Sequence, residues 1–460
     1  MSGALLRSLF SPLCHHHHHH LHHPSRLSLA RYPAAHLHPQ LILSYQQQLR
    51  NRRIMIPAKT DTYRLEREVA VAAVLQAIIV TRRIFDNLIR PHLSSGLDDK
   101  PSITKLDRSP VTVGDYTVQA LVNFILSKYF PDDEIVGEED SSELLNTTDK
   151  KHLEQIVDFT NEALKEDRLC TAADEERWAK FRDQPRLTQD DLVKLIDLGN
   201  SVGGEQAGNR RFWTLDPIDG TKGFLRGEQY AICLALIVDG QVVLGVLGTP
   251  NLPLRGITCP PGQQPEGVLF FAEKGAGAHQ RPLDSNVYSE IRMESINELE
   301  LGRVATFCES TESAHSNHHL TVDIATQMNL DNAYNPIRID SQAKYCILAR
   351  GDTHMYFRFP TSPDYQEKIW VRHVTSFIMI TSPLIFNPRD HAAGSILVSE
   401  AGGIVIDMNE RPLDFSCGRT LSNNTLGFMA CHGRVSNRVW CHAYRVAQVH
   451  KYLSPHEKVV

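Results

Sequence analysis

The chain has 460 residues, of which 42% are hydrophobic and 22% charged, and its formal net charge at pH 7 is −6. This length allows two or three domains, and the composition is that of an ordinary globular protein. The acidic balance gives no sign of a nucleic-acid-binding surface, and no apolar run approaches the roughly 20 residues that a membrane-spanning helix needs. The 9 cysteines include no Cys-x-x-Cys pair, which favours a reducing, intracellular environment over a disulfide framework.

Residues 1–57 differ from the rest of the chain, and we expect them to form a disordered or targeting segment. They contain Arg and Ser and a run of histidines at 15–20, but the first acidic residue of the chain is Asp61. A basic segment without acids is typical of a mitochondrial transit peptide. A low-complexity tail, or a stretch left untranslated by a start at Met55, fits the same composition. The expected compartment is therefore the cytoplasm, or the mitochondrion if residues 1–57 direct import.

Two long helices are predicted at the start of an N-terminal α+β lobe that spans 58–300. Neither glycine nor proline interrupts 62–85, and this segment is built of good helix formers. Within 118–129, apolar residues recur at i, i+3, i+4, i+7, i+8 and i+11, which places them on one face of a helix. That helix is expected to end before Pro131.

Strands are predicted in the same lobe. A short strand at 134–137 follows the second helix. Two apolar, β-branched arms within 230–250 flank Asp239-Gly240, which is a strong signal for a β-hairpin. A further pair of strands is expected at about 267–279.

The C-terminal part, 301–457, is predicted to be a second lobe of α/β type, because strand-like and helix-like segments alternate there. They are strand-like at 303–307, 336–340 and 354–359, and helix-like at 319–329, 341–351 and 390–401. The last helix is followed by Gly402 and Gly403, which are typical of a helix C-terminus.

The segment 216–221, Asp-Pro-Ile-Asp-Gly-Thr, places two carboxylates three residues apart. Pro217 fixes φ and Gly220 permits an unusual turn, so the side chains of Asp216 and Asp219 can converge on one point. Hard oxygen ligands gathered at one point suit Mg²⁺. An Asx-type turn with capping aspartates explains the same residues without a metal.

Further acids lie where regular elements begin or end. Glu138 and Glu139 follow the predicted strand, Asp115 precedes the predicted second helix, and Asp390 opens the last helix. Each has an ordinary explanation, either as a solvated surface residue or as an acid favoured by a helix dipole. Their positions are also those at which a site can be assembled from several segments.

Four motifs together carry a resemblance that covers roughly 58–455. They are Gly-Asp-Tyr at 114–116, Val-Gly-Glu-Glu at 136–139, the segment 216–221, and Asp-His-Ala-Ala-Gly-Ser-Ile-Leu-Val-Ser-Glu-Ala-Gly-Gly at 390–403. Their order and spacing resemble the lithium-sensitive, magnesium-dependent phosphomonoesterases, which include inositol monophosphatases and fructose-1,6-bisphosphatases. The resemblance implies an α/β (α+β) fold, a layered αβαβα sandwich with two lobes.

The same resemblance implies a magnesium site and a hydrolytic mechanism. Two or more Mg²⁺ ions are expected per site, and the implied ligands are Glu138, Asp216, Asp219, Asp390 and the carbonyl oxygen of Ile218. Thr221 and Asp115 are implied to orient and deprotonate the attacking water. Metal ions about 3.5–4 Å apart can hold the attacking and leaving oxygens in line.

Within this superfamily the chain is similar to the 3′(2′),5′-bisphosphate nucleotidases. The similarity lies at 105–116, 130–139, 315–318, 340–346 and 365–370. It implies a small nucleotide carrying two phosphates as the substrate, with contacts from Thr221, His315, Ser341, Lys344, Arg358 and Asp390. Two phosphates need positive charge beyond the metal ions, which a lysine and an arginine can supply.

The implied activity is removal of the 3′-phosphate from adenosine 3′,5′-bisphosphate, which gives AMP and phosphate. Conversion of 3′-phosphoadenylyl sulfate to adenylyl sulfate, a role in sulfur assimilation, and inhibition by Li⁺ follow from the same resemblance. The alternatives are an inositol phosphate phosphatase and a non-catalytic nucleotide-binding regulator. We expect a monomer whose partner is the nucleotide, with neither nucleic acid nor membrane as a partner.

One segment departs from the family's pattern. In the family the Lys-Ile-Trp at 368–370 runs directly into the Asp-His-Ala-Ala-Gly motif, whereas here 19 residues, 371–389, intervene. They are apolar and β-prone, a combination that promotes aggregation when exposed. A genuine insertion that disables the site and an error in the gene model both account for the segment. The simplest retained intron is excluded, because no codon for Arg389 ends in AG.

Overall fold

The computed structural model describes most of Ile54–Val460, one of the two units into which the chain divides; the other is Met1–Arg53. The described residues are 62–93, 109–146, 150–166, 181–204, 210–257, 266–295, 305–312, 317–330, 333, 335–359, 391–419, 427–435, 439, 441, 443, 445 and 446. The predicted segment 1–57 and the insertion 371–389 lie outside these residues.

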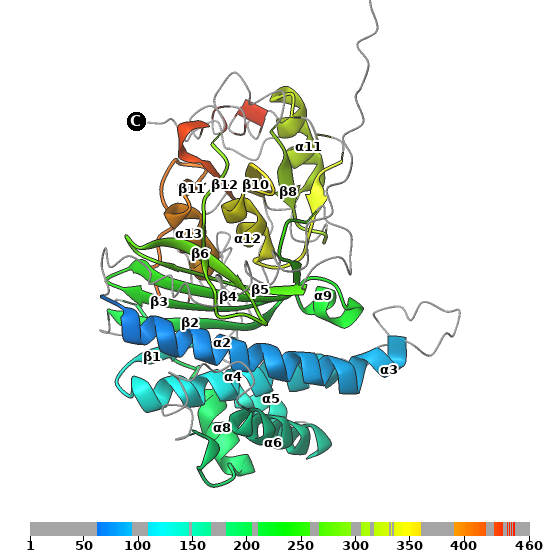
Figure 1. Ribbon diagram of the computed structural model, residues 1–460, viewed down its shortest axis with the longest axis vertical. Coiled ribbons are helices and arrows are strands. Elements are labelled where there is room, and N and C mark those ends of the chain that lie inside the picture. The colour runs from blue at the N-terminus through cyan, green and yellow to red at the C-terminus, as the bar shows by residue number, and fades with distance from the viewer. Residues whose placement is uncertain are drawn as a thin grey trace, which may run out of the picture. The chain divides into compact units, whose positions relative to one another are not determined.

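A layer of helices covers one face of the larger sheet (Figure 1). In this layer α2 (Arg64–Ile84) and α4 (Ser109–Tyr129) lie against the strands. The helix α6 (Lys150–Lys165) packs against both of them, α8 (Gln189–Asp197) packs against α4 and α6, and α5 (Ser141–Asn146) packs against α8. The first predicted helix is confirmed, and it continues through a π-helical turn at Phe85–Ile89 into the short α3 (Arg90–Leu93). Both long helices, α2 and α4, pack against the sheet and against each other.

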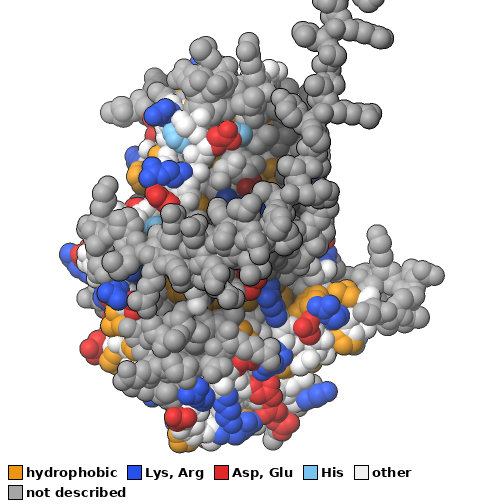
Figure 2. Space-filling model, in the orientation of Figure 1, with side chains coloured by type: hydrophobic (Ala, Val, Ile, Leu, Met, Phe, Trp, Pro, Cys, Tyr) orange, Lys and Arg blue, Asp and Glu red, His pale blue; other side chains and the backbone are white. Residues whose placement is uncertain are grey.

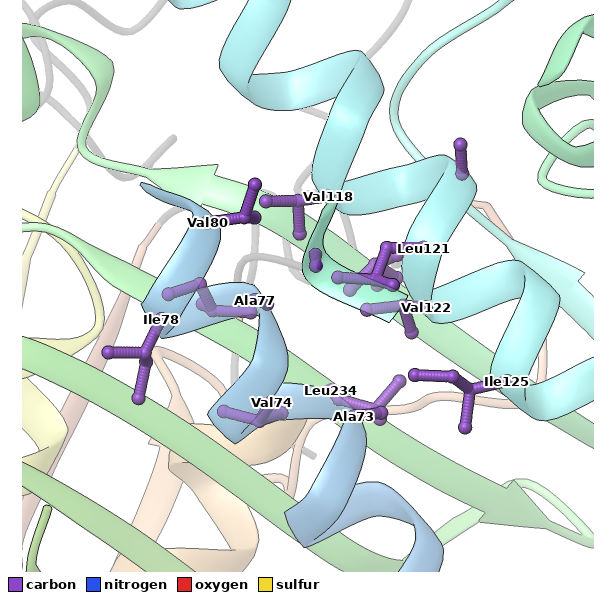
Figure 3. Packing of buried hydrophobic residues seen from close by; sticks show 14 of the residues in the cluster. Ala73, Val74, Ala77, Ile78, Val80, Val118, Leu121, Val122, Ile125 and Leu234 are labelled. Atoms are coloured by element: carbon purple, nitrogen blue, oxygen red, sulfur yellow. The ribbon is translucent and has the colours of Figure 1, made fainter. Parts of the chain in front are cut away.

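The apolar face predicted for the second helix is buried, within a helix whose residues 113–126 are buried on all sides. Val118, Leu121, Val122 and Ile125 lie opposite residues of α2 and beside Leu234 of the sheet (Figure 3). Their spacing repeats with the period of the helix, so all of them can be removed from water at once. Burial of such side chains stabilises the fold by about 1.5–3 kcal/mol each.

The larger sheet has seven strands in sequential order. They are β1 (Glu134–Val136), β2 (Arg211–Asp219), β3 (Ala231–Val238), β4 (Gln241–Pro253), β5 (Glu266–Glu273), β6 (Gly277–Pro282) and β7 (Ser289–Ile291). β1 runs parallel to β2 and the other neighbours are antiparallel. The predicted hairpin is confirmed, since Asp239 and Gly240 take φ angles of 51° and 72° between β3 and β4. Positive φ at both central residues is the geometry of a type I′ turn.

The opposite face of this sheet is covered by α12 (Ala343–Arg350) and α13 (Ala392–Glu400), which also pack on the second sheet (Figure 1). The second sheet has five strands in the order β11-β12-β10-β8-β9. Their bounds are β8 (Phe307–Glu309), β9 (Ile337–Arg338), β10 (Met355–Arg358), β11 (Gly403–Asp407) and β12 (Phe428–His432). A third core, on the outer face of the second sheet, includes residues of α11 (His318–Gln327).

The successive layers are therefore helix, sheet, helix, sheet and helix, which confirms the predicted αβαβα sandwich. The middle layer of helices is buried from both sides: Tyr345 and Leu397 are 1% and 0% exposed. All strands of the first sheet precede those of the second in the chain. A boundary between two lobes near residue 300 stays a prediction.

Among the described residues, no helix combines the length and apolar character needed to span a bilayer. On the face in Figure 2, described Lys and Arg side chains lie among Asp and Glu side chains. Among the described residues, several exposed charges form ion pairs, such as Arg90 with Asp86 at 2.6 Å. Pairs of this kind contribute little to stability.

Candidate active site

A bulge at the end of β2 sets the direction of the two aspartates in 216–221. Asp216 is paired with Cys233 of β3, but Asp219, three residues later, is paired with Ala231, only two residues away. Without the extra residue, positions three apart point to opposite faces of a sheet. With it, Asp216 and Asp219 share a face, the one that α12 and α13 cover. The sequence prediction that these carboxylates can converge is consistent with this register.

Gly220 ends the strand and starts the next helix. Its φ of +90° lies in the left-handed region, as the sequence predicted, and α9 (Thr221–Arg226) begins immediately after it. The hydroxyl of Thr221 donates to the carbonyl oxygen of Ile218 at 3.4 Å. The exposed Thr221 and the carbonyl of Ile218, both proposed for the site, therefore lie side by side.

Asp115 lies inside α4, which corrects the expectation that it precedes this helix. The helix begins at Ser109-Pro110, and proline is favoured in a first helical turn because its missing N–H needs no partner there. Gly114 allows a close approach to β2, since a Cβ at this position would lie 2.7 Å from Cδ1 of Ile218. Asp115 itself is 6% exposed. The contact of Gly114 with Ile218 thus places Asp115 of α4 next to the bulge in β2.

Glu138 follows β1, which runs parallel to β2, so it lies at the same end of the sheet as Asp219. Its backbone N–H donates to Oε1 of Gln119 in α4 at 2.9 Å. Its negative charge acts on Asp219 and raises the pKa of that carboxyl group. Glu138 therefore influences the ionisation of Asp219 electrostatically, as expected for two acids at one site.

Ser341 and Gln342, which precede α12, lie next to the end of β2. The backbone N–H of Gln342 donates to Oδ2 of Asp219. A Cβ on Gly220 would lie 2.9 Å from Cβ of Ser341, so glycine is needed for this approach. Ser341 takes a φ of +66°, which is uncommon for a residue with a side chain. Strained backbone of this type clusters at functional sites.

Lys344 and Arg358 act electrostatically on Asp219. Burial is the largest influence on Asp219 and raises its pKa, whereas the positive charges of Lys344 and Arg358 lower it. Burial lowers the pKa of Lys344 to about 8, and the charge of Asp219 opposes this shift. The ammonium group of Lys344 donates to the carbonyl oxygen of Ile339 at 3.1 Å. The charges of two predicted substrate contacts thus act on a predicted metal ligand.

Charged residues that the sequence analysis did not assign to the site link α9 to the segments around Glu312 and Asp340. Arg226 pairs with Asp340 at 2.5 Å and with Glu312 at 3.1 Å, and Lys222 pairs with Glu312 at 2.7 Å. Asp340 stands directly before Ser341. Their charges were visible in the sequence, but no periodicity links positions so far apart.

Two predicted site residues, His315 and Asp390, lie outside the described residues. Within the described ranges, no three His, Cys, Asp or Glu side chains gather closely enough to hold a metal ion between them. The donors that are described, three carboxylates and the Ile218 carbonyl, are hard oxygens, which are the ligands that Mg²⁺ prefers. The complete ligand set stays a prediction.

The chain is similar to known proteins over most of its length. A model described as the inositol monophosphatase family matches residues 66–442. The 3′(2′),5′-bisphosphate nucleotidase of Schizosaccharomyces pombe is 36% identical over 375 residues, which are 81% of this chain and 93% of the relative. Proteins of the same name from Emericella nidulans and Oryza sativa are 38% and 40% identical, over 79% and 77% of this chain and 93% and 88% of the relatives.

These matches confirm the resemblance that the four motifs carried. They extend across both sheets, from α2 to beyond β12. The chain belongs to the inositol monophosphatase family.

Proposed function

We propose that the chain is a Mg²⁺-dependent phosphomonoesterase that hydrolyses the 3′-phosphate of adenosine 3′,5′-bisphosphate to AMP and phosphate. The observation that carries this proposal is the bulge that turns Asp216 and Asp219 to one face, where Lys344 and Arg358 act on Asp219. The names of the relatives support the nucleotide as the substrate class. By the same reasoning 3′-phosphoadenylyl sulfate is a second substrate, sulfur assimilation is the setting, and Li⁺ is an inhibitor.

Glu138, Asp216, Asp219 and the Ile218 carbonyl, together with Asp390, hold Mg²⁺ in this proposal. Bound Mg²⁺ supplies Lewis-acid chemistry, because it draws negative charge from the phosphate ester. The protein's own part is to present several oxygens on one side of the site and to keep them fixed. The bulge in β2 does this for the two aspartates.

Asp115 takes the proton from the attacking water, and Thr221 orients that water. Both come from elements that meet at Ile218, whose side chain lies against Gly114 and whose carbonyl accepts from Thr221. A positioned base contributes typically 10²–10⁴-fold to a rate. The proton passes directly from water to the carboxylate, and no covalent phospho-enzyme forms.

Ser341, Lys344 and Arg358, together with His315, bind the nucleotide. A substrate with one phosphate bound to metal ions needs little further positive charge from the protein. A nucleotide with a second phosphate needs positively charged side chains to bind that phosphate. Lys344 and Arg358 come from α12 and β10 of the predicted second lobe, while Glu138, Asp216 and Asp219 come from the predicted first lobe. The substrate therefore lies between the two lobes, which fixes its phosphate in line with the attacking water.

The experiment is phosphate release from adenosine 3′,5′-bisphosphate and from inositol 1-phosphate, each with Mg²⁺ and with EDTA. We expect Mg²⁺-dependent release from the nucleotide at the higher kcat/KM. A preference for inositol 1-phosphate would assign the chain to the inositol phosphate phosphatases. The same assay on a variant without 371–389 tests the insertion. If only the shorter form releases phosphate, the full chain is the non-catalytic nucleotide binder considered above.

A further inference from the structure

We infer that Gln119 of α4 is a positioning residue for Glu138, because its buried amide fixes the backbone on which that carboxylate stands. This inference rests on the proposed function, in which Glu138 is a metal ligand. The sequence analysis assigned no role to Gln119. It lies inside the helix whose apolar face packs on α2, yet it is a polar residue with 0% of its surface exposed.

Every hydrogen-bonding position of the Gln119 amide is used by backbone groups. Oε1 accepts from the N–H groups of Glu138 and Glu139, each at 2.9 Å. Nε2 donates to the carbonyl oxygens of Glu139 at 2.7 Å and Ile196 at 2.9 Å. A side-chain amide offers two donors and two acceptor sites, so these four bonds exhaust it. A fully satisfied buried amide of this kind holds its partners rigidly.

Two glycines make room for this amide. A Cβ on Gly137 would lie 2.6 Å from Oε1 of Gln119, and a Cβ on Gly199 would lie 2.6 Å from Nε2. The N–H of Gly137 also donates to the carbonyl oxygen of Gly199 at 2.8 Å. The backbone at Gly137 and Gly199 thus packs closely against the side-chain amide of Gln119. A side chain at either glycine would collide with that amide.

The helix that provides Gln119 also provides the proposed base. Asp115 precedes Gln119 by four residues, so the two side chains lie on the same face of α4, one turn apart. The neighbouring Tyr116 donates its hydroxyl hydrogen to the carbonyl oxygen of Asp140 at 3.0 Å. One rigid helix therefore carries the base and holds residues 138–140. The distance between the base and the metal ligand is set by this helix and not by a loop.

Glu138 is exposed at the surface, and the two hydrogen bonds of Gln119 to residues 138 and 139 fix the position of the backbone that carries its carboxylate. Partners that orient a metal ligand affect metal affinity by about 10- to 100-fold. Replacing Gln119 by Met keeps the length of the side chain but removes all four hydrogen bonds. We expect Gln119→Met to weaken metal binding by about that factor.

The test measures Mn²⁺ binding to the full chain without substrate, by electron paramagnetic resonance, and the Mg²⁺ concentration that gives half-maximal phosphate release. Gln119→Met should shift both by a similar factor. Asn123→Leu is the matched control: Asn123 is a buried amide one turn along α4 that donates to the carbonyl oxygen of Leu195 at 2.8 Å. It should lower the melting temperature without changing metal affinity.

Gly137→Ala approaches the same contact from the other side and covers the case in which Gln119→Met does not fold. Wild-type metal affinity in either folded variant, or an equal loss in Asn123→Leu, overturns the inference. Mn²⁺ binding that weakens as expected in a protein that releases no phosphate supports the inference and refutes the proposed function. A wild-type chain that binds no Mn²⁺ overturns both.

Discussion

The backbone N–H of Gln342 donates a hydrogen bond to Oδ2 of Asp219, although 123 residues separate them in the chain. The side chain of Gln342 makes a second link, since its Oε1 accepts from the N–H of Gly394 in the first turn of α13 at 2.9 Å. Gln342 thus joins the end of β2 to the helix that follows Asp390. The acids of the proposed metal site are held in place by contacts that cross between the two sheets.

The role of Asp115 predicts a separation of binding from turnover. Asp115→Asn keeps the shape of the side chain but removes the base, so kcat should fall by about 10²–10⁴-fold while KM for the nucleotide changes little. Steady-state kinetics with adenosine 3′,5′-bisphosphate measure both. Equal losses in binding and turnover would argue against a base at this position.

Gly220 should tolerate no side chain. In Gly220→Ala the alanine would have to adopt a φ of +90°, and its Cβ would lie 2.9 Å from Cβ of Ser341. We therefore expect loss of stability and of most activity. Gly402→Ala is the control, because Gly402 has a φ of +96° but nothing within 4 Å of a new Cβ. Gly402→Ala should lower the free energy of unfolding only by the cost of placing alanine in the left-handed backbone region, about 1–2 kcal/mol, and should leave kcat unchanged. Chemical denaturation and kinetics of both variants test this, and equal kcat values for the two would refute it.

The buried ion pair between Arg67 and Glu273 should anchor the start of α2. Glu273 is 0% exposed and also accepts from the backbone N–H of Tyr63 at 3.2 Å. Glu273→Gln leaves the Arg67 charge without its partner and should destabilise the fold by about 3–5 kcal/mol. Glu68→Gln, which breaks the exposed pair with Arg64 on the same helix, should cost at most about 1 kcal/mol. Urea unfolding compares the two, and similar losses would contradict the prediction.

His279 should make the fold less stable in mild acid. Burial is the main cause that lowers its pKa, and Arg67 lowers it further, while Glu290 opposes the shift. Below pH about 6.5, the ordinary pKa of histidine, His279 is protonated in the unfolded chain but stays neutral in the folded chain. Stability therefore falls as the pH drops toward the pKa of His279 in the folded chain. Above the unfolded pKa this contribution is constant.

His279→Gln removes this proton uptake. The free energy of unfolding should then decline less steeply between pH 7 and pH 5, by at most about 1.4 kcal/mol per pH unit. The wild-type chain, measured in parallel, provides the reference slope. Urea midpoints at several pH values compare the two proteins, and an unchanged slope in His279→Gln would show that His279 does not contribute.

The sequence by itself determined the elements whose causes are local. The apolar face of α4 follows from the helical period at Val118, Leu121 and Val122, and the β3–β4 turn follows from the freedom of Asp239-Gly240 to take positive φ. The bend at 216–221 was also readable, because Pro217 and Gly220 restrict or release the backbone within a few residues. The four motifs identified the family because their order along the chain is itself sequence information.

Only the tertiary structure decided which distant residues meet at the site. The sequence analysis placed Asp115 before the second helix, whereas α4 begins at Ser109 and includes Gly114, where a Cβ would lie 2.7 Å from Cδ1 of Ile218. The bonds of Gln119 to Glu138 and of Gln342 to Asp219 join segments that no periodicity relates. Backbone preference acts over a few residues, but burial of polar groups requires a partner from anywhere in the chain. Those partners became visible only when the two sheets and their helices were assembled.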